Sequence, residues 1–132
     1  MQLKGWVERQ STRISREDLG LLIAEDPSFL LECGGEFYLE GNGCQARDHF
    51  GIMPGGIPAG TLLCEGKDTL FIDPPVPLLD LPSAIVTAVS LRADDGVVAL
   101  SGGVDSALVA SLAHLPAIAV GEEGSHDLRR AS

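Results

Sequence analysis

One short segment of the chain combines residue types that can bind phosphate. It reads Ser101-Gly102-Gly103-Val104-Asp105-Ser106 and follows the apolar run 96–100. Two adjacent glycines let the backbone turn sharply and approach a ligand with no Cβ in the way. A helix that begins here presents unpaired amides and a partial positive charge, and the two serine hydroxyls add further donors. The segment therefore predicts a loop that binds an anion, above all a phosphate.

The carboxylate of Asp105 limits which anions can bind to the loop. It would repel a bare phosphate, so we expect a cation between the two, and Mg²⁺ is the usual one. The loop is not a Walker A loop, because the only lysines are Lys4 and Lys67 and neither is near it. The simpler alternative is an ordinary strand-to-helix turn in which Asp105 or Ser106 only caps the helix.

The residues around the loop predict a β-α-β unit. The apolar runs 96–100 and 116–120 are typical of parallel strands buried on both faces, and a helix is expected to start over 107–112 between them. Asp80 is expected to cap an earlier helix with an apolar face over 81–89. This pattern predicts the start of a doubly wound parallel α/β sheet, with the ligand at the carboxyl ends of its strands.

The first half of the chain predicts a small α+β domain. Short strands are expected at 3–7, 37–39, 44–46, 61–64 and 69–72, with a hairpin turn at Asn42-Gly43. One helix is expected between a capping box that starts at Ser15 and a stop at Pro27.

The proline-rich segment 73–77 separates the two halves. It is stiff and lacks most amide donors, so it predicts a linker. We expect domains at 1–76 and 77–132.

Composition excludes several classes of partner. The 132 residues include 9 basic and 19 acidic side chains, for a net charge of −10, which disfavours nucleic acid and anionic membrane surfaces. The N-terminus has no signal-peptide pattern and no apolar run is long enough to span a membrane.

The chain contains three cysteines, an odd number, and their spacing suggests no pair: Cys33, Cys44 and Cys64. This predicts reduced thiols and a cytoplasmic protein.

The loop and its flanks resemble a known family. Ser101 to Ser106 matches the Ser-Gly-Gly-x-Asp-Ser order of the PP-loop of ATP pyrophosphatases, and residues 119–128 resemble the second strand and loop of asparagine synthetases. Residues 35–38, 46–54 and 57–62 are similar to segments of the N-terminal glutaminase domain of that family. The resemblance implies a PP-loop, HUP-like sheet preceded by a degenerate Ntn-glutaminase-like domain.

The resemblance also implies a reaction and a set of site residues. ATP would adenylylate an aspartate-like carboxylate with release of pyrophosphate, and ammonia would displace AMP to give the amide. Leu100 and Val120 would pack near the adenosine, and Asp105 would hold Mg²⁺. The full set implied for ATP and pyrophosphate is Leu100, Ser101, Gly102, Gly103, Asp105, Ser106 and Val120.

The chain departs from that family in ways that shape the prediction. Position 2 is Gln2 and no cysteine precedes Cys33, so the family's N-terminal nucleophile is missing and no glutaminase activity is expected. The family's later Ser-Gly-x-Gly-x-Asp-Glu motif is also absent. The helix expected to begin at 128 is cut short just before Ser132, and two parallel strands cannot bury both faces of such a sheet. We therefore expect a truncated chain, inactive alone, or a partner chain or second copy that completes the sheet.

Two alternatives to the amide ligase stay open. One is a nucleotide-binding pseudoenzyme or subunit, and the other is a different PP-loop ATP pyrophosphatase. In the first half, Arg47 and Asp48 are expected to form a structural ion pair, and Trp6 is expected in the core.

Overall fold

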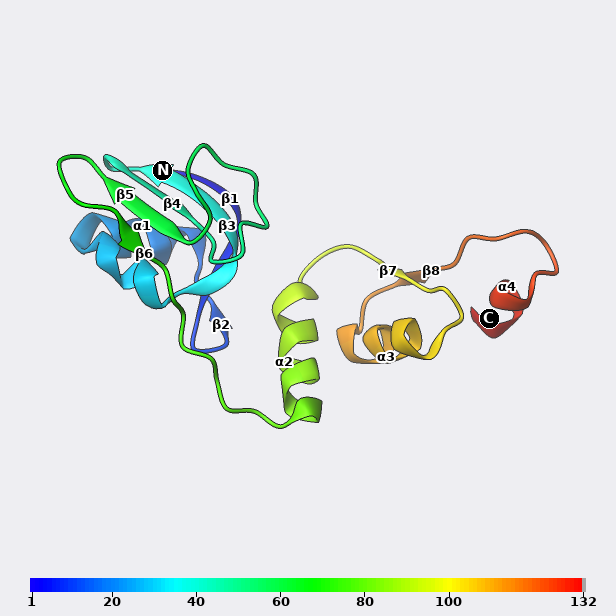
Figure 1. Ribbon diagram of the computed structural model, residues 1–132. Helices are drawn as coiled ribbons and strands as arrows, with labels where there is room; N and C mark the ends of the chain where they lie inside the picture. The colour runs from blue at the N-terminus through cyan, green and yellow to red at the C-terminus, as the bar shows by residue number, and fades with distance from the viewer. Residues whose placement is uncertain (132) are drawn as a thin grey trace. The chain divides into compact units, whose positions relative to one another are not determined.

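The computed structural model describes residues 1–131 and divides the chain into two compact units, Met1–Leu78 and Leu79–Ser132 (Figure 1). The division follows the proline-rich segment, two residues beyond the expected boundary at residue 76.

The first unit is built on a six-stranded antiparallel sheet in the order β2-β1-β3-β4-β5-β6. Helix α1 (Arg16–Glu25) and the 3₁₀ helix η1 (Pro27–Glu32) pack on one face of it. The strands are β1 (Gln2–Arg9), β2 (Thr12–Arg13), β3 (Gly34–Gly41), β4 (Cys44–Arg47), β5 (Thr61–Cys64) and β6 (Leu70–Phe71).

Local sequence signals explain two boundaries of this unit. The expected cap at Ser15 is confirmed, because the Asp18 amide donates to Ser15 Oγ at 3.1 Å and α1 begins at Arg16. The Asp18 carboxylate accepts from the Ser15 hydroxyl at 2.7 Å, not from the Ser15 amide as in a full capping box. The hairpin turn is also confirmed. Asn42 and Gly43 have φ of 51° and 72°, the two left-handed residues that a two-residue hairpin loop requires.

The core of the first unit lies between the sheet and its helices. Phe37 and Leu39 alternate with Tyr38 along β3 and are fully buried. They pack in one cluster that includes Leu19 and Ile23 of α1. The expectation that Trp6 belongs to the core is wrong: it is half-buried, and the guanidinium carbon of Arg13 lies 4.5 Å from its ring centroid.

Arg47 and Asp48 serve the backbone of the loop 51–60 and do not pair with each other, so the expected ion pair is wrong. The guanidinium of Arg47 donates to the carbonyls of Gly51, Met53 and Ile57 at 2.8, 2.8 and 3.1 Å. The Asp48 carboxylate, 1% exposed, accepts the amides of Ile52 and Met53 at 2.8 and 3.0 Å. A partly buried loop needs such partners for its polar groups.

A disulfide joins Cys44 and Cys64, so the expectation of three reduced thiols is wrong. The two residues are 20 positions apart, but they lie directly opposite each other in the β4–β5 register, with Cα atoms 4.0 Å apart. Strand pairing, which no spacing rule captures, brings them together. Cys33 is free and buried.

The second unit contains the predicted β-α-β order. Its elements are α2 (Leu81–Arg92), β7 (Val98–Ala99), α3 (Val104–Ala113), β8 (Ala117–Ile118) and α4 (His126–Ala131). Strands β7 and β8 pair in parallel, with Val98 opposite Ala117, so the crossover connection is confirmed. Asp80 caps α2 as expected, since Oδ1 accepts the Ser83 amide at 2.9 Å.

The expectation that both strands of the second unit are buried on both faces is wrong. Each strand has two residues, and Ile118 is 51% exposed. Leu81 and Val86, expected on the apolar face of α2, are 73% and 49% exposed. Ala113 is the one buried residue among those described here, because two short strands and their helices cannot enclose a core. No described helix in either unit has the length and apolar character to cross a membrane.

Candidate phosphate-binding loop

The candidate loop lies between the carboxyl end of β7 and the first turn of α3. Helix α3 starts at Val104, three residues earlier than expected, so Asp105 and Ser106 belong to its first turn. Gly102 has φ of 78°, a left-handed conformation that favours glycine. Gly103 has φ of −87° and ψ of 160°, which any residue adopts. The sharp turn therefore depends on Gly102, and Gly103 matters because it has no side chain.

Two serine hydroxyls hold the loop in shape. Ser106 Oγ donates to the Gly103 carbonyl at 3.0 Å and accepts the Ser101 amide at 3.2 Å. Ser101 Oγ lies 3.1 Å from Ser106 Oγ. Because the Ser106 proton is used on Gly103, the Ser101 hydroxyl donates in that pair. A longer hydrogen bond of 3.4 Å, from the Gly103 amide to Ser101 Oγ, is the fourth of this set within the loop.

The start of α3 presents amides without helical partners. The first bond of the helix runs from the Ala107 amide to the Gly103 carbonyl at 3.1 Å. The amides of Val104, Asp105 and Ser106 precede it and have no carbonyl one turn back. Aligned peptide dipoles add a partial positive charge at this end. These groups can bind a phosphate oxygen.

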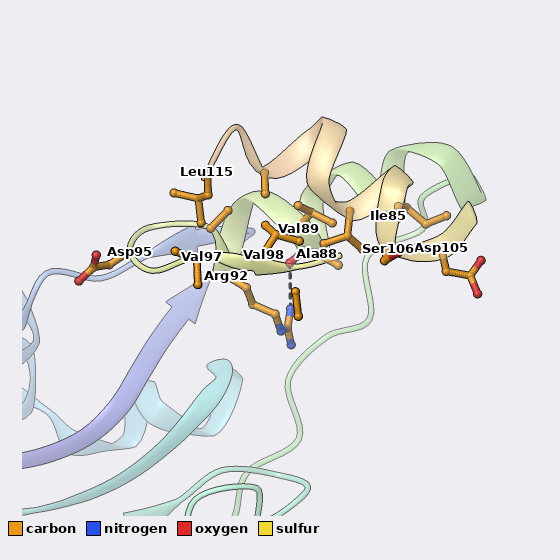
Figure 2. A pocket seen from close by; sticks show the side chains of 14 residues that line it. Ile85, Ala88, Val89, Arg92, Asp95, Val97, Val98, Asp105, Ser106 and Leu115 are labelled. Carbon is orange, nitrogen blue, oxygen red and sulfur yellow. Dashed lines mark hydrogen bonds between the residues drawn. The ribbon is translucent and has the colours of Figure 1, made fainter. Parts of the chain in front are cut away.

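Asp105 is the acidic side chain of this turn. It is exposed, and Figure 2 shows its carboxylate pointing outward at the start of α3. In the part of the chain that the structure describes, no three His, Cys, Asp or Glu side chains gather to hold a metal ion. One carboxylate still fits Mg²⁺ that arrives with a nucleotide, since phosphate oxygens and water supply most of its ligands in such sites.

An apolar cavity of about 740 Å³ lies beside the loop. Ile85 and Val89 of α2, Val98 of β7 and Val109 of α3 line it, and Ser106 borders it (Figure 2). Its lining is mostly apolar, with Arg92, Asp95 and Asp105 as the charged residues, so its walls suit hydrocarbon groups better than phosphate.

Leu100 and Val120 follow the ends of β7 and β8, at the same edge of the parallel pair. The Leu100 amide donates to the Ile118 carbonyl at 2.8 Å, so only its carbonyl remains for a ligand. Val120 is 93% exposed and covers no neighbour. The structure therefore brings Ser101 to Ser106 together as one site, whereas Leu100 and Val120 border it at the strand ends.

The serine bonding pattern was not anticipated from the sequence. The sequence predicted ligand binding for Ser101 and Ser106, or a capping role for Ser106, and no hydrogen bond between the two side chains. The five-residue spacing between them, across a glycine turn, is the signal that could have indicated a hydrogen bond between their hydroxyls.

Comparison of the chain with protein-family models, with curated proteins and with solved structures finds no match.

Proposed function

We propose that the loop 101–106 binds the phosphates of ATP with Mg²⁺, and that the chain forms the nucleotide-binding part of an asparagine-synthetase-like amide ligase. The observation that carries the proposal is the unpaired amides of Val104, Asp105 and Ser106 beside a glycine turn. They lie at the carboxyl end of a parallel strand, where open α/β sheets bind ligands. The PP-loop resemblance of the same residues supports ATP over other anions.

The chain's own residues would act on the pyrophosphate part of ATP. A carboxylate oxygen of an aspartate-like substrate attacks the α-phosphorus, and the bond to the β-phosphate oxygen breaks. The amides at the start of α3 would stabilise the negative charge of the departing pyrophosphate, and the Ser101 and Ser106 hydroxyls would hold the loop in the shape that presents those amides. Asp105 would hold a Mg²⁺ ion that comes with the nucleotide, and that ion would neutralise charge on the phosphate oxygens. Ammonia then attacks the acyl carbon, and AMP leaves.

Residues at the strand ends would hold the nucleoside. The Leu100 carbonyl is available to accept a hydrogen bond from the adenine amino group, because the Leu100 amide is already used in the sheet. Val120 would pack against the adenosine, since it is exposed at the adjacent strand end. ATP-dependent synthesis fits a cytoplasmic location.

A second candidate is a nucleotide-binding subunit that does no chemistry alone. The open apolar surface of the second unit favours it, because Leu81 and Ile118 are exposed and Ala113 alone is buried among the described residues of that unit. A partner chain or a second copy would supply the missing cover.

Calorimetric titration and an exchange assay separate these proposals. ATP, AMP and pyrophosphate are titrated into the chain with and without Mg²⁺, and exchange of labelled pyrophosphate into ATP is then measured with aspartate. Exchange that requires aspartate supports the ligase. Binding of ATP without exchange supports the non-catalytic subunit. If neither ATP nor pyrophosphate binds, the loop is an ordinary strand-to-helix turn and both proposals fail.

A further inference from the structure

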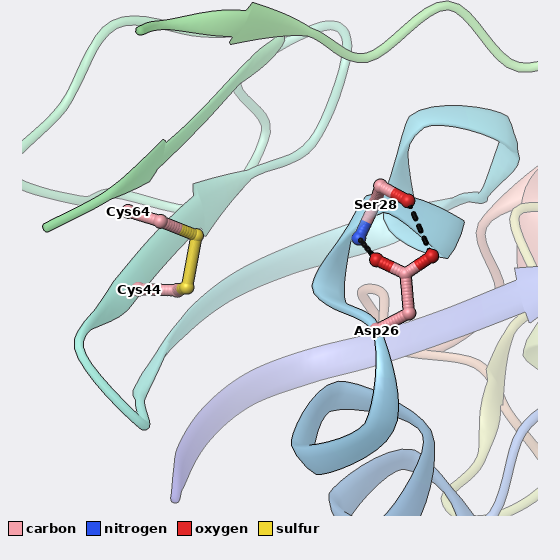
Figure 3. The surroundings of a disulfide bond; sticks show 4 residues. All are labelled: Asp26, Ser28, Cys44 and Cys64. Atoms are coloured by element: carbon pink, nitrogen blue, oxygen red, sulfur yellow. Dashed lines mark hydrogen bonds between the residues drawn. A yellow bond between two sulfur atoms is a disulfide. The ribbon is translucent and has the colours of Figure 1, made fainter. Parts of the chain in front are cut away.

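The disulfide closes one end of the β4–β5 strand pair. The Glu65 amide donates to the Gly43 carbonyl at 2.9 Å just beyond it. Cys44 and Cys64 therefore form the adjacent pair without main-chain hydrogen bonds, where side chains of antiparallel strands lie closest. Figure 3 shows the sulfur–sulfur bond bridging β4 and β5.

The two cysteines differ in exposure. Cys44 is 6% exposed and belongs to the core cluster, whereas Cys64 is half-buried at the edge of that cluster. Two hollows border the bond, one of about 640 Å³ and one of about 480 Å³. Glu25 and Lys67 line the larger hollow together with both cysteines. A small molecule in this hollow can reach the disulfide.

We propose that this disulfide is a site of exchange with small thiols, and that attack occurs at Cys64 Sγ. The thiolate of the small molecule bonds to Cys64 Sγ, the Cys44–Cys64 bond breaks, and the electron pair stays on Cys44 Sγ, which takes a proton from water. A second thiolate attacks the small-molecule sulfur of the mixed disulfide and releases Cys64. The small thiols are oxidised to their disulfide, and the protein gains two thiols.

The surrounding structure lets this bond open without unfolding the unit. Beyond β6, the Ile72 amide donates to the Gly60 carbonyl and the Asp73 amide to the Leu31 carbonyl, each at 2.9 Å. Leu62 and Ile72 are both 1% exposed in the core. The main-chain bonds on either side of the turn 65–68 therefore stay in place when the disulfide is reduced.

The charges around Cys64 favour a cationic thiol. Glu25 and Glu65 face the larger hollow with Lys67, and Asp26 and Asp68 line a smaller hollow that also reaches Cys64. The Ser28 hydroxyl and amide donate to the Asp26 carboxylate at 2.7 and 2.9 Å and hold its pKa below the ordinary value, so it stays charged to lower pH than a free aspartate (Figure 3). Carboxylates thus outnumber the ammonium group, and cysteamine should react faster than mercaptoacetate at equal thiolate concentration.

The test uses the whole chain and two variants, Cys44→Ser and Cys64→Ser, each treated with cystamine, the disulfide of cysteamine. We expect the Cys44→Ser chain to form a mixed disulfide at Cys64 about tenfold faster than the Cys64→Ser chain forms one at Cys44. Intact mass and peptide mapping locate the adduct. Cys33 is the internal control, because it is free and buried in the structure and neither substitution changes it.

The unmodified chain provides the second readout. It should show one alkylatable thiol after denaturation, and three after prior treatment of the folded chain with millimolar cysteamine. Added salt should reduce the advantage of cysteamine over mercaptoacetate. Three thiols before any reductant would overturn the proposal, as would reduction only in denaturant or faster adduct formation at Cys44. These outcomes are independent of ATP binding.

Discussion

Removing the Ser106 hydroxyl is the most direct test of whether the loop must keep its hydrogen-bonded shape to bind ATP. The Ser106→Ala change deletes the hydrogen bonds to the Gly103 carbonyl, the Ser101 amide and the Ser101 hydroxyl. These bonds are partly exposed, so water replaces them at a low net cost of about 0.5 kcal/mol each, or about 1.5 kcal/mol together. If the loop must hold this shape to bind ATP, that loss raises Kd about tenfold.

Ser111→Ala is the matched control for this experiment. Ser111 is on the same helix, and its hydroxyl donates to the Leu108 carbonyl at 2.8 Å, outside the loop. The substitution removes a serine hydroxyl from α3 without touching the phosphate-binding groups. Its Kd for Mg-ATP should equal that of the parent chain.

Calorimetric titration with Mg-ATP and with pyrophosphate provides the measurement, and circular dichroism checks that both variants keep their helices. The reasoning is refuted if Ser106→Ala binds as tightly as the parent. It is also refuted if Ser111→Ala loses as much affinity, because the effect would then come from the helix and not from the loop.

Three further predictions concern the loop glycines, its carboxylate and the buried thiol. Gly102→Val should destabilise the second unit by about 1–2 kcal/mol in thermal unfolding, because φ at Gly102 is 78°. Gly103→Val should fold normally, because φ there is −87°, but should not bind ATP in a titration. Equal stability of the two variants would contradict this prediction. Asp105→Asn should weaken binding of Mg-ATP yet strengthen binding of metal-free pyrophosphate, and loss of both would show that the carboxylate only supports the fold. Burial raises the pKa of Cys33 to about 11, so the folded chain keeps a proton that the unfolded chain releases above about pH 9. Its contribution to stability should therefore fall between about pH 9 and pH 11, and a Cys33→Ala chain should lack this slope in urea unfolding.

Local signals predicted many of the elements. The cap at Ser15, the turn at Asn42-Gly43 and the cap at Asp80 are each set by a few adjacent residues, so the chain's local chemistry determines them. The strand–loop–helix order around Gly102 was predicted for the same reason. The phosphate-binding role of that loop stays a prediction.

The tertiary structure decided the side-chain contacts and the burial that depend on residues far apart in the sequence. The disulfide between Cys44 and Cys64 requires the β4–β5 register, and the roles of Arg47 and Asp48 require the path of the loop 51–60. Apolar runs such as 116–120 predict a strand, but burial depends on what packs against it, and Ile118 is 51% exposed. Residue types and short spacings thus determined where helices, turns and the candidate loop form, whereas contacts between strands far apart in the chain determined which side chains meet and which stay open to solvent.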